Sequence, residues 1–186
     1  DSGLSGGRTQ LSVITRCLFQ GHRDIGAYMT SGGNIDGSDD DAFVVAKMNK
    51  FLECSAGIRA TRQLRGYIVS HNFFEKCRFG VLANEASSND VWLPGPQDVV
   101  IQGNEFWDTE RTAIDVKYSD RGEVSGNIIV NYTTDLKFDE AAIHLRGTRH
   151  VKCHDNHIEL PAGSEAGRRA IRLEDMAVRG TGAGQL

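Results

Sequence analysis

Three short segments carry charged side chains at matching places. Residues 113–117 read AIDVK, residues 142–146 read AIHLR and residues 170–174 read AIRLE. Their third and fifth positions hold Asp115 and Lys117, His144 and Arg146, and Arg172 and Glu174. Arg and Lys bind carboxylates, Lys, Arg or His can remove the proton beside a carboxylate, and Asp often holds a Ca²⁺ that acidifies that proton. If the fold brings the three segments together, they form a candidate acid–base site for a substrate that carries carboxylates.

A repeat in the sequence indicates the frame that would position these segments. KMNKFLECSAGI (residues 47–58) aligns with SHNFFEKCRFGV (residues 70–81), so that Asn, Phe, Cys and Gly recur in the same order with one common offset. The pattern V-x-I-x-x-N-x-F, followed after a variable stretch by a small residue and an aliphatic one, recurs along the chain. Its Asn residues are Asn49, Asn72, Asn104, Asn127 and Asn156. Such internal periodicity predicts a stack of similar structural units.

Apolar residues alternate with period two within each copy, which predicts short β-strands and argues against helices. One copy cannot bury its own apolar side, but copies stacked about 4.8 Å apart would share an interior and form parallel sheets. The recurring Asn residues would then form an internal hydrogen-bonded ladder. The sequence also predicts a stacked column made of Phe19, Phe51, Phe74 and Phe106, continued by Ile129 and Ile158.

Small residues recur where each copy turns into its last strand. They are Gly26, Gly57 and Gly80, followed by Ala113, Ala142 and Ala170. We expect either a positive φ or a close approach of the neighbouring coil at these positions.

The four cysteines are predicted to be buried free thiols that act as small apolar groups. Cys17 occupies a ladder position and Cys54 stacks under Cys77, where side chains about 4.8 Å apart are slightly too distant for a relaxed disulfide. The stretch CHDNH (residues 153–157) would place its Cys and Asn inward and its two His outward. Ligands on opposite faces cannot share one ion, so a metal site is not expected there.

On these motifs the chain resembles the right-handed parallel β-helix proteins of the pectate-lyase-like superfamily, over roughly residues 11–174. The resemblance implies an all-β solenoid of about six coils. We expect a single domain over residues 1–186, with flexible or capping ends at residues 1–10 and 175–186, or a piece of a longer β-helix. Many members of this superfamily handle long acidic polysaccharides; they include pectate lyases, polygalacturonases, uronan epimerases and bacteriophage tailspikes.

In this register one outward column along the last strand of each coil runs Tyr28, Arg59, Leu82, Asp115, His144, Arg172, and the next runs Thr30, Thr61, Asn84, Lys117, Arg146, Glu174. The predicted catalytic residues are Asp115, Lys117, His144, Arg146 and Arg172, acting on a uronate. Tyr28, Arg59, Trp92 and Glu174 are the predicted substrate-binding residues.

Strand spacings place the carboxylates of Asp115 and Glu174 about 12 Å apart. Glycoside hydrolysis needs two carboxylates about 5 to 9.5 Å apart, so elimination or epimerisation fits better. The alternative is that these charges are those of any solvated sheet, paired between coils.

Two long loops add further expectations. TSGGNIDGSDDDA (residues 30–42) holds four carboxylates, and these four could bind Ca²⁺, a cation that takes six or more oxygen ligands. The four are Asp36, Asp39, Asp40 and Asp41. The loop lacks the ligand order of an EF-hand, and the alternative is a solvated acidic loop. Trp92, in the loop NEASSNDVWLPGPQ (residues 84–97), could stack on a sugar ring, pack into a neighbouring subunit or fold back over the sheet.

The overall composition argues against some classes of protein. A net charge of −4 is not that of a nucleic-acid-binding protein, and no run of about 18 apolar residues predicts a transmembrane helix. We expect an extracellular protein that engages a polysaccharide. The alternative function is a non-catalytic structural or receptor-binding segment of a tailspike or surface fibre, either as a homotrimer or stacked on further β-helix coils.

Overall fold

The computed structural model describes residues 4–7, 11–30, 43–61, 65–83, 96–132, 141–160 and 169–174. Side-chain positions are not described at residues 4–7, 28–30 and 61. The described part of the chain consists of β-strands, turns and bends, and it contains no helix long and apolar enough to cross a membrane.

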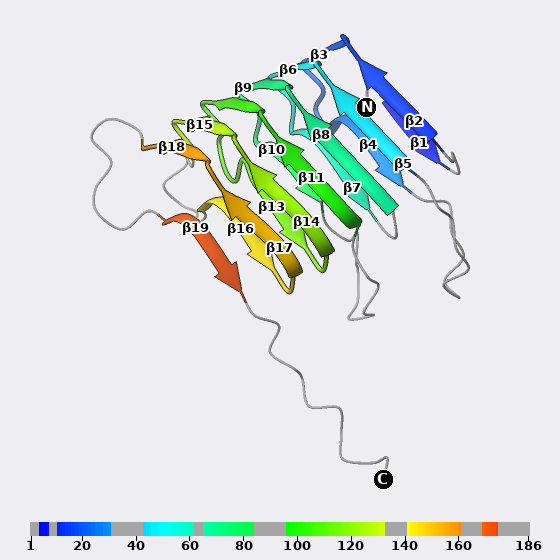
Figure 1. The fold of residues 1–186 in the computed structure, drawn as a ribbon. Helices are drawn as coiled ribbons and strands as arrows, with labels where there is room; N and C mark the ends of the chain where they lie inside the picture. Colours follow the sequence, from blue (N-terminus) through cyan, green and yellow to red (C-terminus); the bar gives the residue numbers. More distant parts are fainter. Residues whose placement is uncertain are drawn as a thin grey trace, which may run out of the picture.

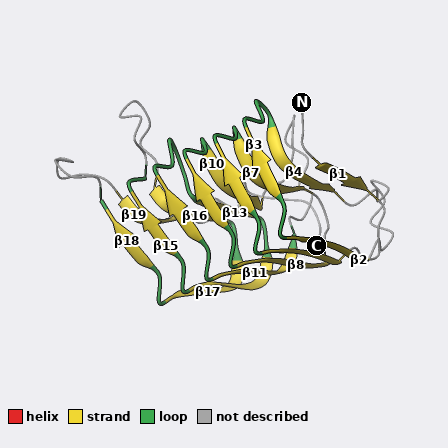
Figure 2. Cartoon of the chain, turned by 90° about the horizontal axis from the view of Figure 1, so that it is seen from above, coloured by secondary structure: helices red, strands yellow, loops and turns green. Residues whose placement is uncertain are grey.

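The strands form three parallel sheets, which we name sheets A, B and C (Figures 1 and 2). Sheet A contains β1 (Leu4–Gly7), β4 (Ile25–Thr30), β7 (Ala56–Thr61), β10 (Phe79–Ala83), β13 (Ile114–Lys117), β16 (Ala141–Arg146) and β19 (Arg169–Glu174). Sheet B contains β2 (Leu11–Thr15), β5 (Phe43–Lys47), β8 (Arg65–Ser70), β11 (Gln97–Gln102), β14 (Asp120–Ser125) and β17 (Arg149–His154). Sheet C contains β3 (Leu18–Gln20), β6 (Lys50–Leu52), β9 (Phe73–Glu75), β12 (Glu105–Trp107), β15 (Ile128–Val130) and β18 (His157–Glu159).

The chain visits sheets A, B and C in turn, and each round forms one coil of a solenoid. Every strand pairs in parallel with the equivalent strand of the next coil, as between β13 and β16. This arrangement confirms the predicted parallel β-helix of about six coils. The fold follows from the period-two alternation, because only side-by-side stacking buries the apolar side of strands this short.

An asparagine ladder runs through the turns between sheets B and C. Asn72 Oδ1 accepts hydrogen bonds from the backbone N of Asn49 at 2.9 Å and from its Nδ2 at 3.0 Å. The same two bonds join Asn72 to Asn104, and Asn104 to Asn127. The Nδ2 of Asn72 also donates to the backbone O of Ala46 at 2.9 Å. The ladder was predicted from the sequence, and it satisfies buried backbone groups that would otherwise lack partners.

The phenylalanine column is also present. Rings of Phe19, Phe51, Phe74 and Phe106 stack with centroids 4.8, 4.9 and 4.6 Å apart and nearly parallel planes. Ile129 is fully buried as the next member of the column.

The glycines beside this column are required for space. A Cβ on Gly57 would lie 2.5 Å from the ring of Phe74, and one on Gly80 would lie 2.4 Å from the ring of Phe106. We expected either a positive φ or a close approach of the neighbouring coil at these positions. Neither glycine has a positive φ, so the close approach explains them. Gly gives way to Ala113 where the column changes from Phe to the smaller Ile129.

The cysteine prediction was partly wrong. Cys54 and Cys77 are buried free thiols, whereas Cys17 is exposed and Cys153 is half-buried. Cys17 joins β2 to β3, the first strands of sheets B and C, so no earlier strand of these two sheets covers it. Cys153 lies at the opposite end, in the last strand of sheet B.

Candidate functional site

The charged residues predicted from the sequence meet on sheet A, where β13, β16 and β19 lie side by side (Figure 1). The pairing register aligns Asp115, His144 and Arg172 in one column. It aligns Lys117, Arg146 and Glu174 in the other. The two columns are those predicted, because parallel pairing aligns equivalent positions of the repeat from coil to coil.

Asp115 is the most enclosed member of this cluster. Only 5% of its surface is exposed, although it belongs to the outward column. Lys117 Nζ lies 2.9 Å from Asp115 Oδ2, and His144 Nδ1 lies 3.2 Å from Asp115 Oδ1. Burial raises the pKa of the Asp115 carboxyl, but the contact with His144 and the charge of Lys117 outweigh burial, so the pKa is lowered. Asp115 is therefore held as a carboxylate.

Glu174 is the second carboxylate of the cluster. His144 Nε2 lies 3.3 Å from Glu174 Oε2, Arg146 Nε lies 3.5 Å from the same oxygen, and the Arg172 guanidinium contacts Oε1. Partial desolvation raises the pKa of the Glu174 carboxyl, while the charges of His144, Arg172 and Arg146 lower it and prevail.

The His144 ring thus lies between two carboxylates, with one ring nitrogen directed at each. His144 Nε2 and Asp115 Oδ1 are buried atoms that make no aligned hydrogen bond among the described residues, so these contacts are electrostatic. A histidine oriented by a carboxylate on one nitrogen is a common arrangement for proton transfer at the other.

Cationic side chains outnumber the carboxylates here. Among the described residues, Lys117, Arg146 and Arg172 face the two carboxylates of Asp115 and Glu174, which is one cation more than the carboxylates before His144 is counted. The surplus favours an anionic ligand.

The side chains of Asp115 and Glu174 are separated only by the His144 ring, and are closer than the strand spacing alone indicated. The expected separation of about 12 Å was therefore too large, because both side chains converge on the histidine between them. A paired-carboxylate hydrolysis needs open space for a sugar or a water between the carboxylates. The imidazole fills that space, so this geometry still does not favour hydrolysis.

Arg59 lies on the same face but does not contact the cluster. Its backbone aligns with Tyr28 on one side and Leu82 on the other, and Leu82 separates it from Asp115. The buried Nε of Arg59 has no hydrogen-bond partner among the described residues. The backbone of Tyr28 continues the column, while the position of its side chain lies outside the described part.

The predicted loop sites lie outside the described residues. These are Trp92 and the four carboxylates Asp36, Asp39, Asp40 and Asp41. The calcium and aromatic sites therefore stay predictions. In the described part of the chain, no three His, Cys, Asp or Glu side chains are placed to hold a metal ion, CHDNH included.

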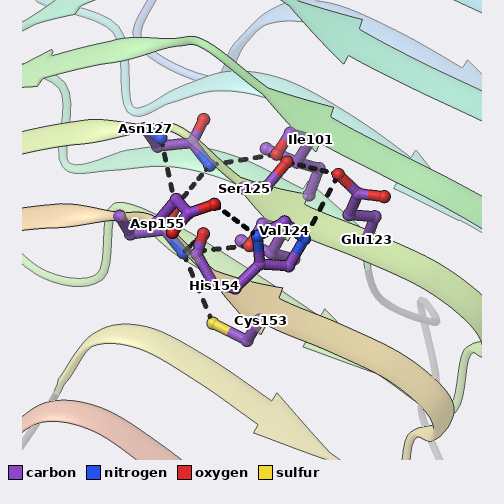
Figure 3. A network of polar contacts seen from close by, with 9 residues as sticks. Ile101, Glu123, Val124, Ser125, Asn127, Cys153, His154 and Asp155 are labelled. Carbon is purple, nitrogen blue, oxygen red and sulfur yellow. Dashed lines mark hydrogen bonds and ion pairs between the residues drawn. The ribbon is translucent and has the colours of Figure 1, made fainter.

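Sequence reasoning missed a second set of ion pairs, on the outer face of sheet B. His150 Nδ1 lies 3.1 Å from Asp120 Oδ1. His154 Nδ1 lies 2.9 Å from Asp155 Oδ2, and its Nε2 lies 3.5 Å from Glu123 Oε1 (Figure 3). Outward columns read along sheet B, as along sheet A, would have found Glu123, His150 and His154, whereas Asp120 is the first residue of β14 and Asp155 lies in the turn after β17.

The family comparison agrees with the observed coils. The family model described as a right-handed beta helix region matches residues 2–167. Neither a curated protein nor a solved structure matches the chain significantly. The three parallel sheets, the asparagine ladder and this match lead to one conclusion about identity: the chain belongs to the right-handed β-helix family.

Proposed function

We propose that the protein binds acidic, uronate-containing polysaccharides on the outer face of sheet A, and that it removes a proton from a bound uronate as a lyase or epimerase. The observation that carries the proposal is His144, held between Asp115 and Glu174 beside an excess of cationic side chains. An uncharged or cationic sugar would gain nothing from this excess, whereas a uronate carboxylate would.

The substrate carboxylate competes with Glu174 for Arg146 and Arg172. Glu174 is the more exposed of the two carboxylates, so displacing it costs less than displacing Asp115. Once Glu174 moves away, His144 Nε2 faces the substrate while Asp115 holds Nδ1.

His144 Nε2 then takes the proton from the carbon beside the substrate carboxylate. In elimination the electron pair of that C–H bond forms a carbon–carbon double bond, and the glycosidic C–O bond on the adjacent carbon breaks. The leaving oxygen takes a proton from water. In epimerisation a proton returns to the same carbon from the opposite face.

A Ca²⁺ ion does not fit between the residues of this cluster. Both oxygens of Asp115 already face cationic or histidine nitrogens, so they are not available as metal ligands. The reaction is therefore derived through the side chains alone.

The test combines binding and product formation. Titration calorimetry against a panel of uronate polymers, with a neutral polymer of similar length as control, should show binding to uronates that weakens with salt. Arg172→Ala should weaken binding more than about tenfold, as expected for the loss of a charge-assisted contact. Binding that is equal for neutral and acidic polymers, or absent for all of them, would refute the proposal.

The catalytic part is followed by the ultraviolet absorbance of the unsaturated product and by proton exchange with heavy water. His144→Gln should reduce either signal by about 10²- to 10⁴-fold, the usual contribution of a general base. The matched control is His150→Gln, which removes a histidine paired with Asp120 on sheet B and should leave the signal unchanged. Binding without either signal would establish a non-catalytic glycan-binding protein instead.

A further inference from the structure

Two of the free cysteines lie directly over one another inside the solenoid. Cys54 and Cys77 are 2% and 0% exposed. Each follows a Phe of the stacked column by three residues, and Phe51 pairs with Phe74 in the register of sheet C. The backbone N of Arg78 donates to the backbone O of Cys54 at 2.9 Å, so the two coils stay aligned through the turn that follows. The two thiols therefore occupy the same place in adjacent coils.

The distance between coils limits the chemistry that two such thiols can share. Parallel strands lie about 4.8 Å apart, and so do the Cβ atoms of stacked residues. A relaxed disulfide needs Cβ atoms about 3.5 to 4.5 Å apart. Metal–thiolate bonds are about 2.3 Å long in zinc sites, so two sulfurs on opposite sides of one ion lie about 4.6 Å apart. The coil spacing is thus long for a disulfide and close to the spacing of two sulfurs that hold one ion between them.

The surroundings of the two sulfurs favour a thiolate pair that holds a cation. The Cys54 sulfur takes a backbone hydrogen bond from His22, and the Cys77 sulfur takes one from Cys54 in the same way. Hydrogen bonds of this kind stabilise the thiolate, which is the form that binds metals. Cys54 Sγ also lies 3.4 Å from the backbone O of Leu52, and Cys77 Sγ lies 3.6 Å from that of Glu75. These carbonyl oxygens favour a positive charge close to the sulfurs.

A polar group without a partner follows in the same column. The backbone N of Glu110 donates to the backbone O of Cys77 at 3.0 Å, as Arg78 does to Cys54, so Thr109 is the next member after Cys77. Thr109 is fully buried, and its Oγ1 has no hydrogen-bond partner among the described residues. This hydroxyl is an available donor for the Cys77 sulfur once that sulfur is anionic.

From this geometry we propose that Cys54 and Cys77 bind one soft monovalent metal ion, of the Cu(I) class, between their sulfurs. Two S–H bonds break, two metal–sulfur bonds form, and both protons leave to solvent without any change of oxidation state. Soft thiolate ligands select Cu(I), whereas Ca²⁺ needs oxygen ligands. Zn²⁺ needs a larger ligand set than two thiolates, and the described part of the chain places no three His, Cys, Asp or Glu side chains together. This proposal does not depend on glycan binding.

The test starts from a variant in which only the stacked pair of thiols remains. Cys17→Ser and Cys153→Ser together remove the exposed and the half-buried thiol and leave the buried pair in place. Under oxygen-free conditions, Cu(I) is titrated into this variant in competition with a coloured Cu(I) chelator. We expect uptake of one ion per chain, the ultraviolet charge-transfer absorbance of a metal thiolate, and two sulfur neighbours in X-ray absorption. Zn²⁺ in place of Cu(I) should give no comparable uptake.

Two further changes to this variant make the test specific to the pair. Cys77→Ser should weaken Cu(I) binding more than about 100-fold, because losing only a hydrogen-bonding partner of a metal ligand already costs about 10- to 100-fold. The matched control is Thr109→Val, which changes the next member of the column but keeps both thiols. It should still take up one ion per chain, with an affinity loss of at most about tenfold for one hydrogen bond. Urea unfolding verifies that each variant is folded.

Three results would overturn the proposal. The first is no uptake of Cu(I) by the variant that keeps only Cys54 and Cys77, a result that does not depend on the folding of any core variant. The second is uptake that survives Cys77→Ser or that is lost equally with Thr109→Val. The third is a sulfur count other than two, which would mean that the ion is held by a different set of ligands.

Discussion

A double-mutant cycle at Gly80 and Phe106 can test whether the rings of the phenylalanine column require a residue without a side chain beside them. A Cβ on Gly80 would lie 2.4 and 2.5 Å from two ring carbons of Phe106 and 2.5 Å from the backbone O of Ala113. Ordinary contacts lie at about 3.5 to 4.0 Å, so each overlap is about 1 Å. Overpacking costs about 1 to 3 kcal/mol in general. We expect the upper end, about 3 kcal/mol, for Gly80→Ala, because a backbone atom is among the three contacts and cannot rotate away.

Phe106→Ile alone should cost about 1 to 2 kcal/mol, since it removes the stacking on Phe74, whose ring centroid lies 4.6 Å away. In the double variant the two clashing ring carbons are gone. The double variant should therefore cost about 1 to 2 kcal/mol less than the sum of the two single variants. The part of the Gly80→Ala cost that remains reflects the contact with the Ala113 oxygen. The double variant places an Ala beside an Ile, and the chain already contains this combination at Ala113 and Ile129.

The assay is urea unfolding at constant pH, with the free energy taken from the midpoint and slope. The control cycle pairs Gly80→Ala with Phe51→Ile, which is further along the column and does not face Gly80. It should be additive within about 0.5 kcal/mol. If the free-energy costs of Gly80→Ala and Phe106→Ile also add within about 0.5 kcal/mol, the ring does not determine the residue size at position 80.

Three further predictions use the same unfolding measurement. Asn104→Ala should lower the free energy of unfolding by at least about 3 kcal/mol, because it removes four buried hydrogen bonds and leaves the buried backbone N–H of Asn72 without its acceptor; a loss below about 1 kcal/mol would mean that the ladder is not important for stability. The pKa values of Asp115 and Glu174 are lowered in the folded chain, so their contribution is present at neutral pH and is lost as the pH falls below about 4. Asp115→Asn should flatten that decline, and an unchanged pH profile would contradict the assignment. Gly21→Ala should cost only about 1 to 2 kcal/mol, because φ is +67° but no atom lies within 4 Å of the added Cβ; a cost equal to that of Gly80→Ala would contradict the steric explanation.

Much of the fold could be predicted from the sequence, because the residue patterns that define it are short and recur in every coil. The alternation of apolar residues defines strands, and the recurring Asn and Phe define which positions of successive coils stack. Since parallel strands pair in register, the alignment of Asp115 with His144 and Arg172 follows directly from the repeat. The same reasoning placed Cys153 and Asn156 inward, where Cys153 packs against the core and Asn156 joins the ladder.

Other properties depend on side-chain direction and on what lies above and below each coil. The repeat gives the strand spacing between Asp115 and Glu174, but only the three-dimensional structure shows that both side chains turn toward His144. The exposure of Cys17 and of Leu173 depends on their place at the two ends of the stack, and the repeat alone treats every coil as covered.

The sequence by itself thus determined the solenoid, its register and the residue columns, because these follow from a period that each coil repeats. The tertiary structure decided how charges meet within a column and why Gly80 must lack a side chain. Those features arise from contacts between coils, whose distances depend on side-chain conformation and packing and not on the period alone.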